Sequence, residues 1–423
     1  MLRTGSLTLW MLLVCLVSVL LLGTIPVRAD DRYDGQNRGA VRLLKIIPIP
    51  ANLKPLVVFD ISWLDAATQR YYLADRSNAA IDVVDAQREI FLKVIPGGFA
   101  GFTGSNNTSG PNGVTVSGRW LFATDAPSRV VTIDLTTDRV VSEVNTGGAA
   151  GLRADELAYD PQDGLIFAVN NADDPPFATL ISVNKSTGAL TRGTRITYDG
   201  ASAGFDATNG AEQPVWDPDT GKLYNSIPEV NCPGAHDTPP NPICGGSFPN
   251  GGVAEISPHT SGAVEALFPV EHCQPAGLTL GPKQDLLLGC SQAFDTAGNA
   301  WSASDANSAA PISVIMDAVN GNIDKNVAGV SGNDEVWFNK GDGRYYLAAR
   351  NQPGGPVLGI IDADSQTLVQ LVPTVNKSPG SAHSLAVNPH SNHAFVPLPA
   401  NNVFPNCLNG CIGVFGTPNE HHD

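Results

Sequence analysis

Acidic side chains recur in this chain at the points where apolar stretches begin. Asp155 and Glu156 stand before one such stretch, Glu212 before another, and Asp334 and Glu335 before a third. Carboxylate oxygens suit a hard divalent ion such as Ca²⁺ or Mg²⁺ better than a soft metal. If the fold brings the five acids together, we expect a metal site in which the cation polarises a carbonyl group or activates water.

Other side chains with useful chemistry occupy similar places. His383 stands before an apolar stretch, and His272 lies just ahead of another. An imidazole beside a metal ion could act as a general acid or base. The amides of Asn112, Gln213 and Gln274 are candidate binding groups at the same level. All of these assignments depend on a fold that makes distant parts of the sequence neighbours.

The elements that would position these residues form an internal repeat. Each copy opens with a short apolar strand that ends in a turn, as in Glu156-Leu-Ala-Tyr-Asp-Pro161, Gln213-Pro-Val-Trp-Asp-Pro218 and Ser384-Leu-Ala-Val-Asn-Pro389. Three more strand-like stretches follow in most copies. A single four-stranded unit cannot bury both of its faces, but radially packed copies can, and a period of about 40–60 residues suits this arrangement. The sequence predicts an all-β fold, a seven-bladed β-propeller, rather than a β-sandwich or two smaller domains.

The blades are predicted at 56–97, 111–147, 153–200, 210–270, 272–331, 332–376 and 381–417. The seventh lacks a fourth strand, and the strand-like segment 40–48 has no blade of its own. We expect this segment to complete the seventh blade, because closure removes exposed sheet edges. One propeller domain would then span 40–418, after a signal peptide at 1–29 and a disordered segment at 30–39. A disordered tail is expected at 419–423.

In a propeller, the inner strand of every blade starts beside the central channel at one face of the disc. The candidate residues would therefore form a ring at the channel mouth, where they could hold a cation or could simply be solvated. Three long loops, at 228–252, 291–311 and 397–410, should emerge at the same face and either wall a pocket or cap the ring. Four tryptophans fall on strand positions, and we expect them to pack between blades: Trp63, Trp120, Trp216 and Trp337.

The N-terminal segment has the features of a secretory signal. Arg3 precedes an apolar run at 7–22, and small residues at 27–29 form a cleavage site; an uncleaved anchor is the alternative. Removal of residues 1–29 takes away two basic residues and no acidic one, which changes the formal net charge from −16 to −18. Such an acidic surface repels nucleic acid and anionic membranes. We expect a periplasmic or secreted monomer with no nucleic-acid partner and no membrane span after cleavage.

Six cysteines follow the signal segment, and an even number in an exported chain predicts disulfides. Proximity suggests the pairs Cys232–Cys244, Cys273–Cys290 and Cys407–Cys411. The second pair would join neighbouring strands of the fifth blade. A metal site made of thiolates is the alternative, but no CxxC pair accompanies these cysteines.

Two repeat phrases carry a family resemblance. Tyr72-Leu-Ala-Asp-Arg-Ser-Asn-Ala-Ala-Ile-Asp-Val-Val-Asp85 and Leu121-Phe-Ala-Thr-Asp-Ala-Pro-Ser-Arg-Val-Val-Thr-Ile-Asp134 resemble the repeats of exported bacterial YVTN-type propellers. They are also similar to repeats of NHL-type, lactonase-like and streptogramin-lyase-like propellers. Gluconolactonase-type relatives place acidic and Asn ligands on a central Ca²⁺, but their motifs do not align here residue by residue, so no catalytic residue is carried over.

The resemblance implies a fold more than a function, because these propellers include both enzymes and binding proteins. Our main expectation is a binding or scaffold module that holds a small-molecule or protein ligand at the channel mouth. The alternative is a lactonase-like hydrolase or lyase that depends on Ca²⁺ or Mg²⁺ in the central channel.

Overall fold

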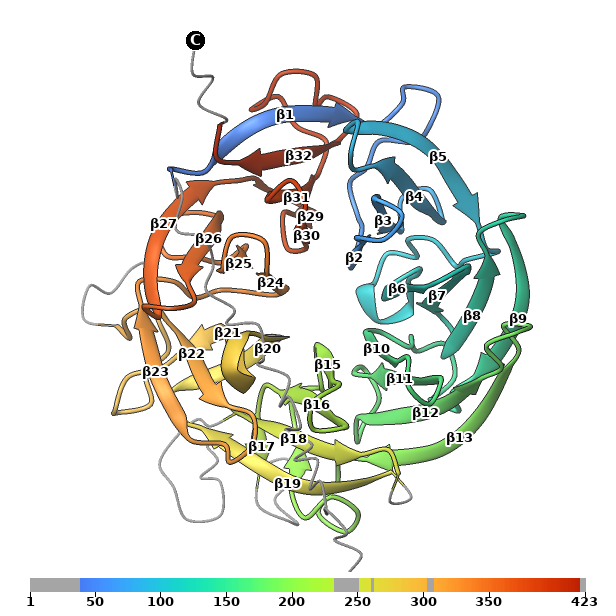
Figure 1. Cartoon of the computed structure of the whole chain (residues 1–423). Helices are drawn as coiled ribbons and strands as arrows, with labels where there is room; N and C mark the ends of the chain where they lie inside the picture. The colour runs from blue at the N-terminus through green and yellow to red at the C-terminus, as the bar shows by residue number, and fades with distance from the viewer. Residues whose placement is uncertain (1–38, 232–250, 260–261, 303–307, 419–423) are drawn as a thin grey trace, which may run out of the picture. The chain divides into compact units, whose positions relative to one another are not determined.

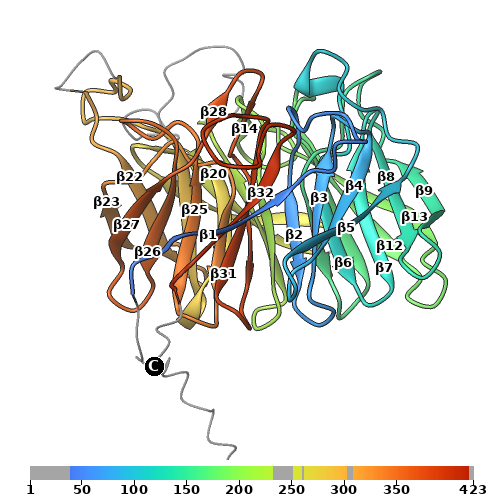
Figure 2. The same cartoon turned by 90° about the horizontal axis from the view of Figure 1, so that it is seen from above.

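The computed structural model describes residues 39–231, 251–259, 262–302 and 308–418. Seven four-stranded antiparallel sheets, which we call blades one to seven, surround a central axis (Figure 1). Seen from the edge of the ring, the strands run between the two faces of a disc (Figure 2). The expected seven-bladed β-propeller is confirmed.

The strands follow the chain from the inner to the outer edge of each blade in blades one to six. Blade one contains β2 (Ser62–Asp65), β3 (Arg70–Asp75), β4 (Ala80–Asp85) and β5 (Ile90–Pro96). Blade two contains β6 (Val114–Ser117), β7 (Trp120–Asp125), β8 (Arg129–Asp134) and β9 (Arg139–Asn145). Blade three contains β10 (Leu157–Asp160), β11 (Leu165–Asn170), β12 (Phe177–Val183) and β13 (Leu190–Thr197). Blade four contains β15 (Pro214–Asp217), β16 (Lys222–Ile227), β18 (Gly251–Ser257) and β19 (Ala263–Val270). Blade five contains β20 (Cys273–Leu280), β21 (Asp285–Ala293), β22 (Ile312–Asp317) and β23 (Ile323–Ala328). Blade six contains β24 (Val336–Asn339), β25 (Arg344–Ala349), β26 (Val357–Asp362) and β27 (Thr367–Pro373).

Blade seven is assembled from both ends of the sequence. It contains β30 (Ala386–Asn388), β31 (His393–Leu398), β32 (Cys411–Gly416) and, at its outer edge, β1 (Arg42–Pro48). The smaller elements are the pairs β14 (Asp206–Ala207) with β17 (Val230–Asn231) and β28 (Asn376–Lys377) with β29 (Gly380–Ser381), and the 3₁₀ turns η1 (Asn106–Thr108) and η2 (Pro282–Gln284).

Ring closure follows the prediction made for segment 40–48. β1 pairs antiparallel with β32, from Arg42 opposite Gly416 to Pro48 opposite Cys411. The side chain of Gln370 on blade six holds the start of this strand, because it accepts from the backbone N–H of Val41 (2.9 Å) and donates to its carbonyl oxygen (2.8 Å).

The turn after each inner strand explains the repeated Asp-Pro or Asn-Pro phrase. Asp160 accepts a hydrogen bond from the backbone N–H of Gln162 (2.7 Å), and Asp217 accepts one from Asp219 (2.9 Å). The proline between them presets the backbone of the turn. This local chemistry starts the second strand at the same place in several blades.

The core consists of seven apolar clusters in the described part of the chain, one at each junction between neighbouring blades. Tyr346 and Leu358 of blade six pack with Val396 and Phe415 of blade seven, for example. Another cluster joins the composite seventh blade to blade one, and five more fill the remaining junctions. The burial of both faces of every sheet is what a ring of blades provides. The described residues include no helix with the length and apolar character that a membrane span requires.

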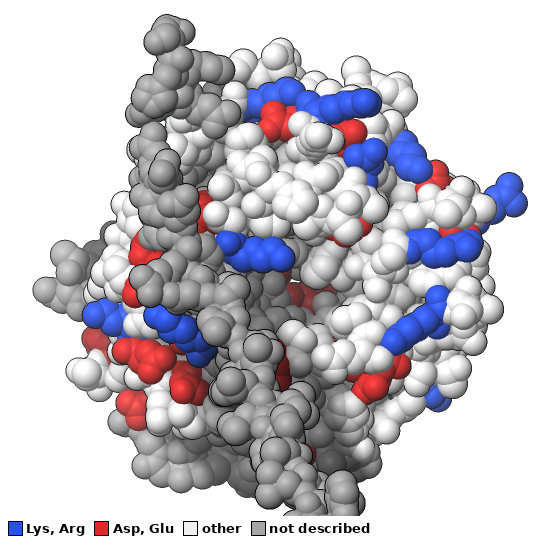
Figure 3. Space-filling model, in the orientation of Figure 1, with Lys and Arg blue, Asp and Glu red and all other residues white. Residues whose placement is uncertain are grey.

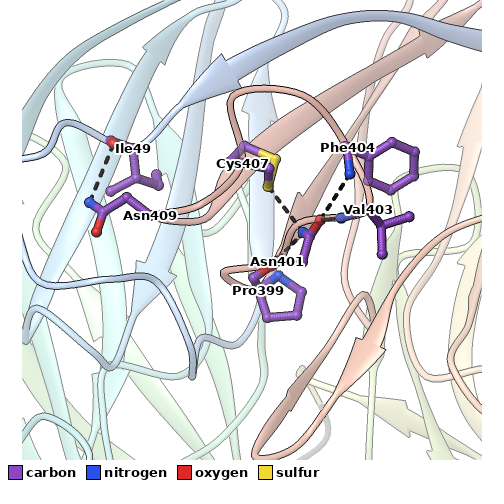
Figure 4. Close-up of a disulfide and its surroundings, with 8 residues drawn as sticks. Ile49, Pro399, Asn401, Val403, Phe404, Cys407 and Asn409 are labelled. Carbon is purple, nitrogen blue, oxygen red and sulfur yellow. Dashed lines mark hydrogen bonds between the residues drawn. A yellow bond between two sulfur atoms is a disulfide. The ribbon is translucent and has the colours of Figure 1, made fainter.

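Two predicted disulfides are confirmed. Cys273–Cys290 joins the adjacent strands β20 and β21, and Cys407–Cys411 closes the loop before β32 (Figure 4). Within that loop, Asn401 donates to the carbonyl oxygen of Pro399 (2.7 Å) and accepts from two backbone N–H groups. The third predicted pair, Cys232–Cys244, lies outside the described residues.

Candidate functional site at the channel mouth

A cavity of about 110 Å³ lies where the inner strands begin. Figure 3 shows the opposite face of the ring, whose centre is hollowed, with acidic side chains visible deep in the hollow. The structure brings the five predicted acids and His383 to this cavity. Its six carboxyl groups and three guanidinium groups, which we call the mouth cluster, are Asp60, Asp155, Glu156, Glu212, Asp334, Glu335, Arg76, Arg153 and Arg350.

Backbone hydrogen bonds between blades set this convergence. The N–H of Gly113 donates to the carbonyl oxygen of Asp155 (3.0 Å), and the N–H of Glu335 donates to that of His383 (3.2 Å). Each bond links the segment before one inner strand to the corresponding segment of the next blade. The acids are therefore held on rigid backbone around one axis.

Arginines, which the sequence reasoning did not single out, neutralise part of the acidic ring. Arg76 forms a buried ion pair with Asp60, and its Nε donates to Oδ1 of Asn112 (2.9 Å). Nη2 of Arg153 lies 2.6 Å from Oδ2 of Asp155, and its Nη1 lies 3.6 Å from Oδ2 of Asp60. Charged groups this far from water require such partners.

Arg350, the third arginine, lies nearer the solvent than the other two. A repeated sequence phrase could have revealed both Arg76 and Arg350. Arg350 places Nη1 2.9 Å from Oδ2 of Asp334. Arg76 and Arg350 each follow the second strand of their blade, after the matching phrases Tyr-Tyr-Leu-Ala-Asp and Tyr-Tyr-Leu-Ala-Ala. Asn171 occupies the same place in blade three and donates to Oε1 of Glu212 (3.3 Å). The loop after the second strand therefore delivers polar side chains to the mouth.

The carboxyl groups that arginine reaches differ in their ionisation. Burial alone would raise the pKa of Asp60, but Arg76, His383 and Arg153 together hold it well below its ordinary value of 3.8. Burial raises the pKa of Asp155 to about 7, although Arg153 opposes this shift. Asp60 is therefore a carboxylate at neutral pH, whereas Asp155 titrates there.

Three glutamates of the cluster are left protonated by their surroundings. Burial raises the pKa of Glu212 to about 8, and the charge of Asp155 adds to the effect. Burial also raises the pKa values of Glu156 and Glu335 far above the ordinary value of 4.5, and the surrounding acids add to it. The carboxyl groups of Glu156 and Glu335 lie close enough to influence each other's pKa. Oε2 of Glu335 is buried and has no hydrogen-bond partner among the described residues.

His383 is fixed on three sides. Its ring stacks on Phe59, with 5.0 Å between centroids and 7° between planes. Nδ1 lies 2.9 Å from the carbonyl oxygen of Ser381, and Nε2 lies 3.3 Å from Oδ1 of Asp60. The imidazole thus belongs to the arginine-paired half of the cluster and connects blade seven to blade one.

The remaining predicted residues lie beside the cavity rather than on its lining. Oε1 of Gln213 accepts from the backbone N–H groups of Leu278 (2.7 Å) and Val336 (3.3 Å), so this side chain ties three inner strands together. Nδ2 of Asn112 donates to the carbonyl oxygen of Ala154 (2.7 Å).

The two predicted residues of blade five, Gln274 and His272, also lie outside the lining of the cavity. Gln274 donates to Oε2 of Glu229 (3.2 Å). His272 lies in the turn before β20, with a left-handed backbone (φ 61°). Its Nδ1 is buried and has no hydrogen-bond partner in the described ranges.

The mouth cluster does not fit the expected Ca²⁺ or Mg²⁺ site. Such ions need several oxygen ligands that converge on one point, and no group of three or more His, Cys, Asp or Glu side chains in the described ranges has that arrangement. The guanidinium group of Arg153 contacts the carboxylates of both Asp155 and Asp60, and that of Arg76 pairs with Asp60, so arginines supply the positive charge there.

Comparison with known proteins supports the fold alone. No protein-family model matches the chain, and no curated protein matches it in sequence. Among solved structures, a chain of Kuenenia stuttgartiensis hydrazine synthase is similar, with a TM-score of 0.60 and 13% identity. The match covers 86% of this chain and 96% of that one. At this identity the likeness shows a shared propeller architecture and carries no activity across.

Proposed function

We propose that this propeller is a noncatalytic binding module whose channel mouth holds a positively charged, hydrogen-bond-donating group of a small molecule or a protein. The observation that carries the proposal is the division of the mouth cluster into two halves. Arginines pair with Asp60, Asp155 and Asp334. Glu156, Glu212 and Glu335 line the same cavity without an ion pair in the part of the chain that the structure describes.

The unpaired half is suited to a primary ammonium group. Oε2 of Glu335 is a buried acceptor without a partner among the described residues, and an unsatisfied group of this kind is costly. An ammonium group carries three N–H donors and fits a cavity of about 110 Å³, which is too small for a ring system with substituents. Its positive charge favours the ionised form of nearby carboxyls. Binding should therefore release protons from glutamates that are protonated in the free protein.

Calorimetric titration with methylammonium at pH 7 tests this proposal. In two buffers that differ in ionisation enthalpy, the apparent enthalpy of binding should differ, because released protons are taken up by the buffer. The double substitution Glu156→Gln and Glu335→Gln preserves the shape of the pair but removes its ability to ionise when a cation binds. We expect it to weaken binding by about tenfold or more, as for loss of a charge-assisted hydrogen bond.

The matched control is Glu143→Gln, which removes one exposed carboxylate from the outer strand β9. It should bind methylammonium like the parent protein. Equal affinity of the parent and the double variant would refute the proposal. Turnover of an ester or lactone panel that requires Ca²⁺ or Mg²⁺ would instead favour the metal-dependent hydrolase or lyase.

We also propose that the chain is related to exported YVTN-type propellers and works in the periplasm or outside the cell. The repeat phrases support the relationship. The two disulfides support the location, because disulfides form and persist in oxidising compartments. Non-reducing peptide mapping of the protein from its native source would test the location.

A further inference from the structure

A second cavity, with a volume of about 410 Å³, lies on the inner strands of blades one to four. Its lining includes Ser117 at the end of β6 and Pro161 in the turn after β10. Inner strands begin at the mouth, so these residues lie toward the opposite end of the channel. We call this cavity the tryptophan recess, because Trp63 and Trp216 line it.

The tryptophan recess is separate from the mouth. No residue lines both cavities. Gln213 stands in the sequence between Glu212, at the mouth, and Pro214, in the recess. Its side chain is held by the backbone of β20 and β24, as described above. A ligand of the recess would therefore be recognised without the mouth cluster.

The lining determines the kind of molecule that fits. It contains no Asp, Glu, Lys, Arg or His, so an ion would lose its hydration without compensation. Two indoles and the phenol ring of Tyr159 supply flat apolar surfaces, which favour offset stacking or edge contacts with another ring. Ser117 and Tyr159 add hydroxyl groups to the lining. The volume falls within the range of roughly 300–1,000 Å³ found for small-molecule sites.

The indoles of the recess differ from a purely structural tryptophan. Trp120 is buried, and its Nε1 donates to the carbonyl oxygen of Lys185 (2.8 Å). Trp63 and Trp216 are only half-buried, and their Nε1 atoms have no acceptor among the described residues. Neither ring is anchored by a hydrogen bond of its own there. Trp63 is supported on one side by Trp337, with 5.1 Å between ring centroids.

We propose that the tryptophan recess binds an uncharged, flat aromatic molecule that carries a hydroxyl, amine or carbonyl group. The rings supply the contact area, and the hydroxyls of Ser117 and Tyr159 orient the polar group. This inference is independent of the function proposed for the mouth.

Binding of the neutral fluorophore N-phenyl-1-naphthylamine tests the inference. Its emission rises in apolar surroundings, and nearby tryptophans can transfer energy to it. The parent protein should show saturable binding at one site. Trp216→Ala should weaken this binding about tenfold or more, because a stacked ring and its buried area are lost. Val215→Trp should weaken it similarly by filling the recess, whereas Trp216→Tyr, which keeps a ring, should retain most of the affinity.

Two controls separate the recess from other effects. Trp120→Phe changes the protein's own fluorescence but should leave the affinity unchanged, and so should the double substitution of Glu156 and Glu335 at the mouth. The inference is overturned if the parent protein shows no saturable binding. It is also overturned if both Trp216→Ala and Val215→Trp bind the probe as the parent does.

Discussion

Glu212 offers a direct measurement of the energy stored in the mouth cluster. Its ordinary pKa of 4.5 is raised to about 8 in the folded protein, first through burial and then through the charge of Asp155. At pH 7 the unfolded chain ionises this carboxyl, whereas the folded protein keeps it mainly protonated. Each pH unit between the two states costs about 1.4 kcal/mol, so the penalty at pH 7 is about 3 kcal/mol.

Glu212→Gln removes this penalty while preserving shape, because the amide oxygen can still accept the hydrogen bond from Asn171. Below the unfolded-state pKa the carboxyl is protonated in both states, so the folded protein pays no penalty for burying it. As the pH rises toward and through the folded-state pKa, the unfolded state gains stability by ionising and the penalty to folding grows. We therefore expect the variant to exceed the parent in free energy of unfolding by up to about 3 kcal/mol at pH 7, by more at pH 8 and by nothing at pH 4.

Urea unfolding at these three pH values, followed by tryptophan fluorescence, measures the difference. Glu143→Gln controls for the change in net charge, because its carboxylate is largely exposed on β9. A gain that does not change with pH, or a loss of stability at pH 7, would show that the raised pKa of Glu212 is not the cause. If the mouth binds cations, Glu212→Gln should also bind methylammonium more weakly, so that stability and function oppose each other at one residue.

Three further outcomes are expected. Arg76→Met removes the nearest ion-pair partner of the buried Asp60 and should lower the free energy of unfolding by up to about 3–5 kcal/mol in urea titrations, with part of the loss recovered by adding Asp60→Asn. The parent protein should become more stable as the pH falls from 8 to 4.5, because the folded-state pKa values of Asp155 and Glu212 are about 7 and about 8; a constant or falling midpoint of urea unfolding would contradict this. Gln370→Ala removes both hydrogen bonds to Val41 and should speed amide hydrogen exchange in β1 without affecting blade three.

The architecture was predictable because the repeat expresses local physics. The repeat unit consists of short apolar strands joined by turn residues such as Asp160, and its length is that of one four-stranded sheet. Such a repeat allows few alternatives to a ring of sheets. The unpaired strand at 40–48 also had only one place to go once the seventh blade was seen to lack an edge. Cysteine proximity was informative for Cys273 and Cys290 because adjacent strands of a meander bring such residues side by side.

The mouth was predictable in its acids but not in its charge balance. Strand starts converge by geometry alone, so Glu156 and Glu335 could be placed near each other. The pairing of Arg76 with Asp60 depends on how a long side chain from the loop after the second strand turns toward the mouth, which no strand pattern encodes. A charge count over those loops, rather than over the inner strands, would have found Arg76 and Arg350.

The tryptophans show a different limit. Strand phase distinguishes the two faces of a sheet, and on that basis Trp120 was placed correctly between blades. An inner strand has a third environment, because its free edge borders the channel. Trp63 and Trp216 touch the apolar clusters on one side and the recess on the other. Alternation along a strand cannot separate these two situations.

The composite seventh blade has a consequence for the order of events during biosynthesis. β1 is made before all the other described strands, whereas its partner β32 is made after them. Until β32 has been made, β1 has no strand in blade seven with which to pair. Blades one to six can form their strand pairs as they emerge, but the contact between the two ends of the sequence is strongly non-local and slow to form. If the chain is exported through a membrane in an unfolded state, closure can occur only on the far side, after β32 has crossed.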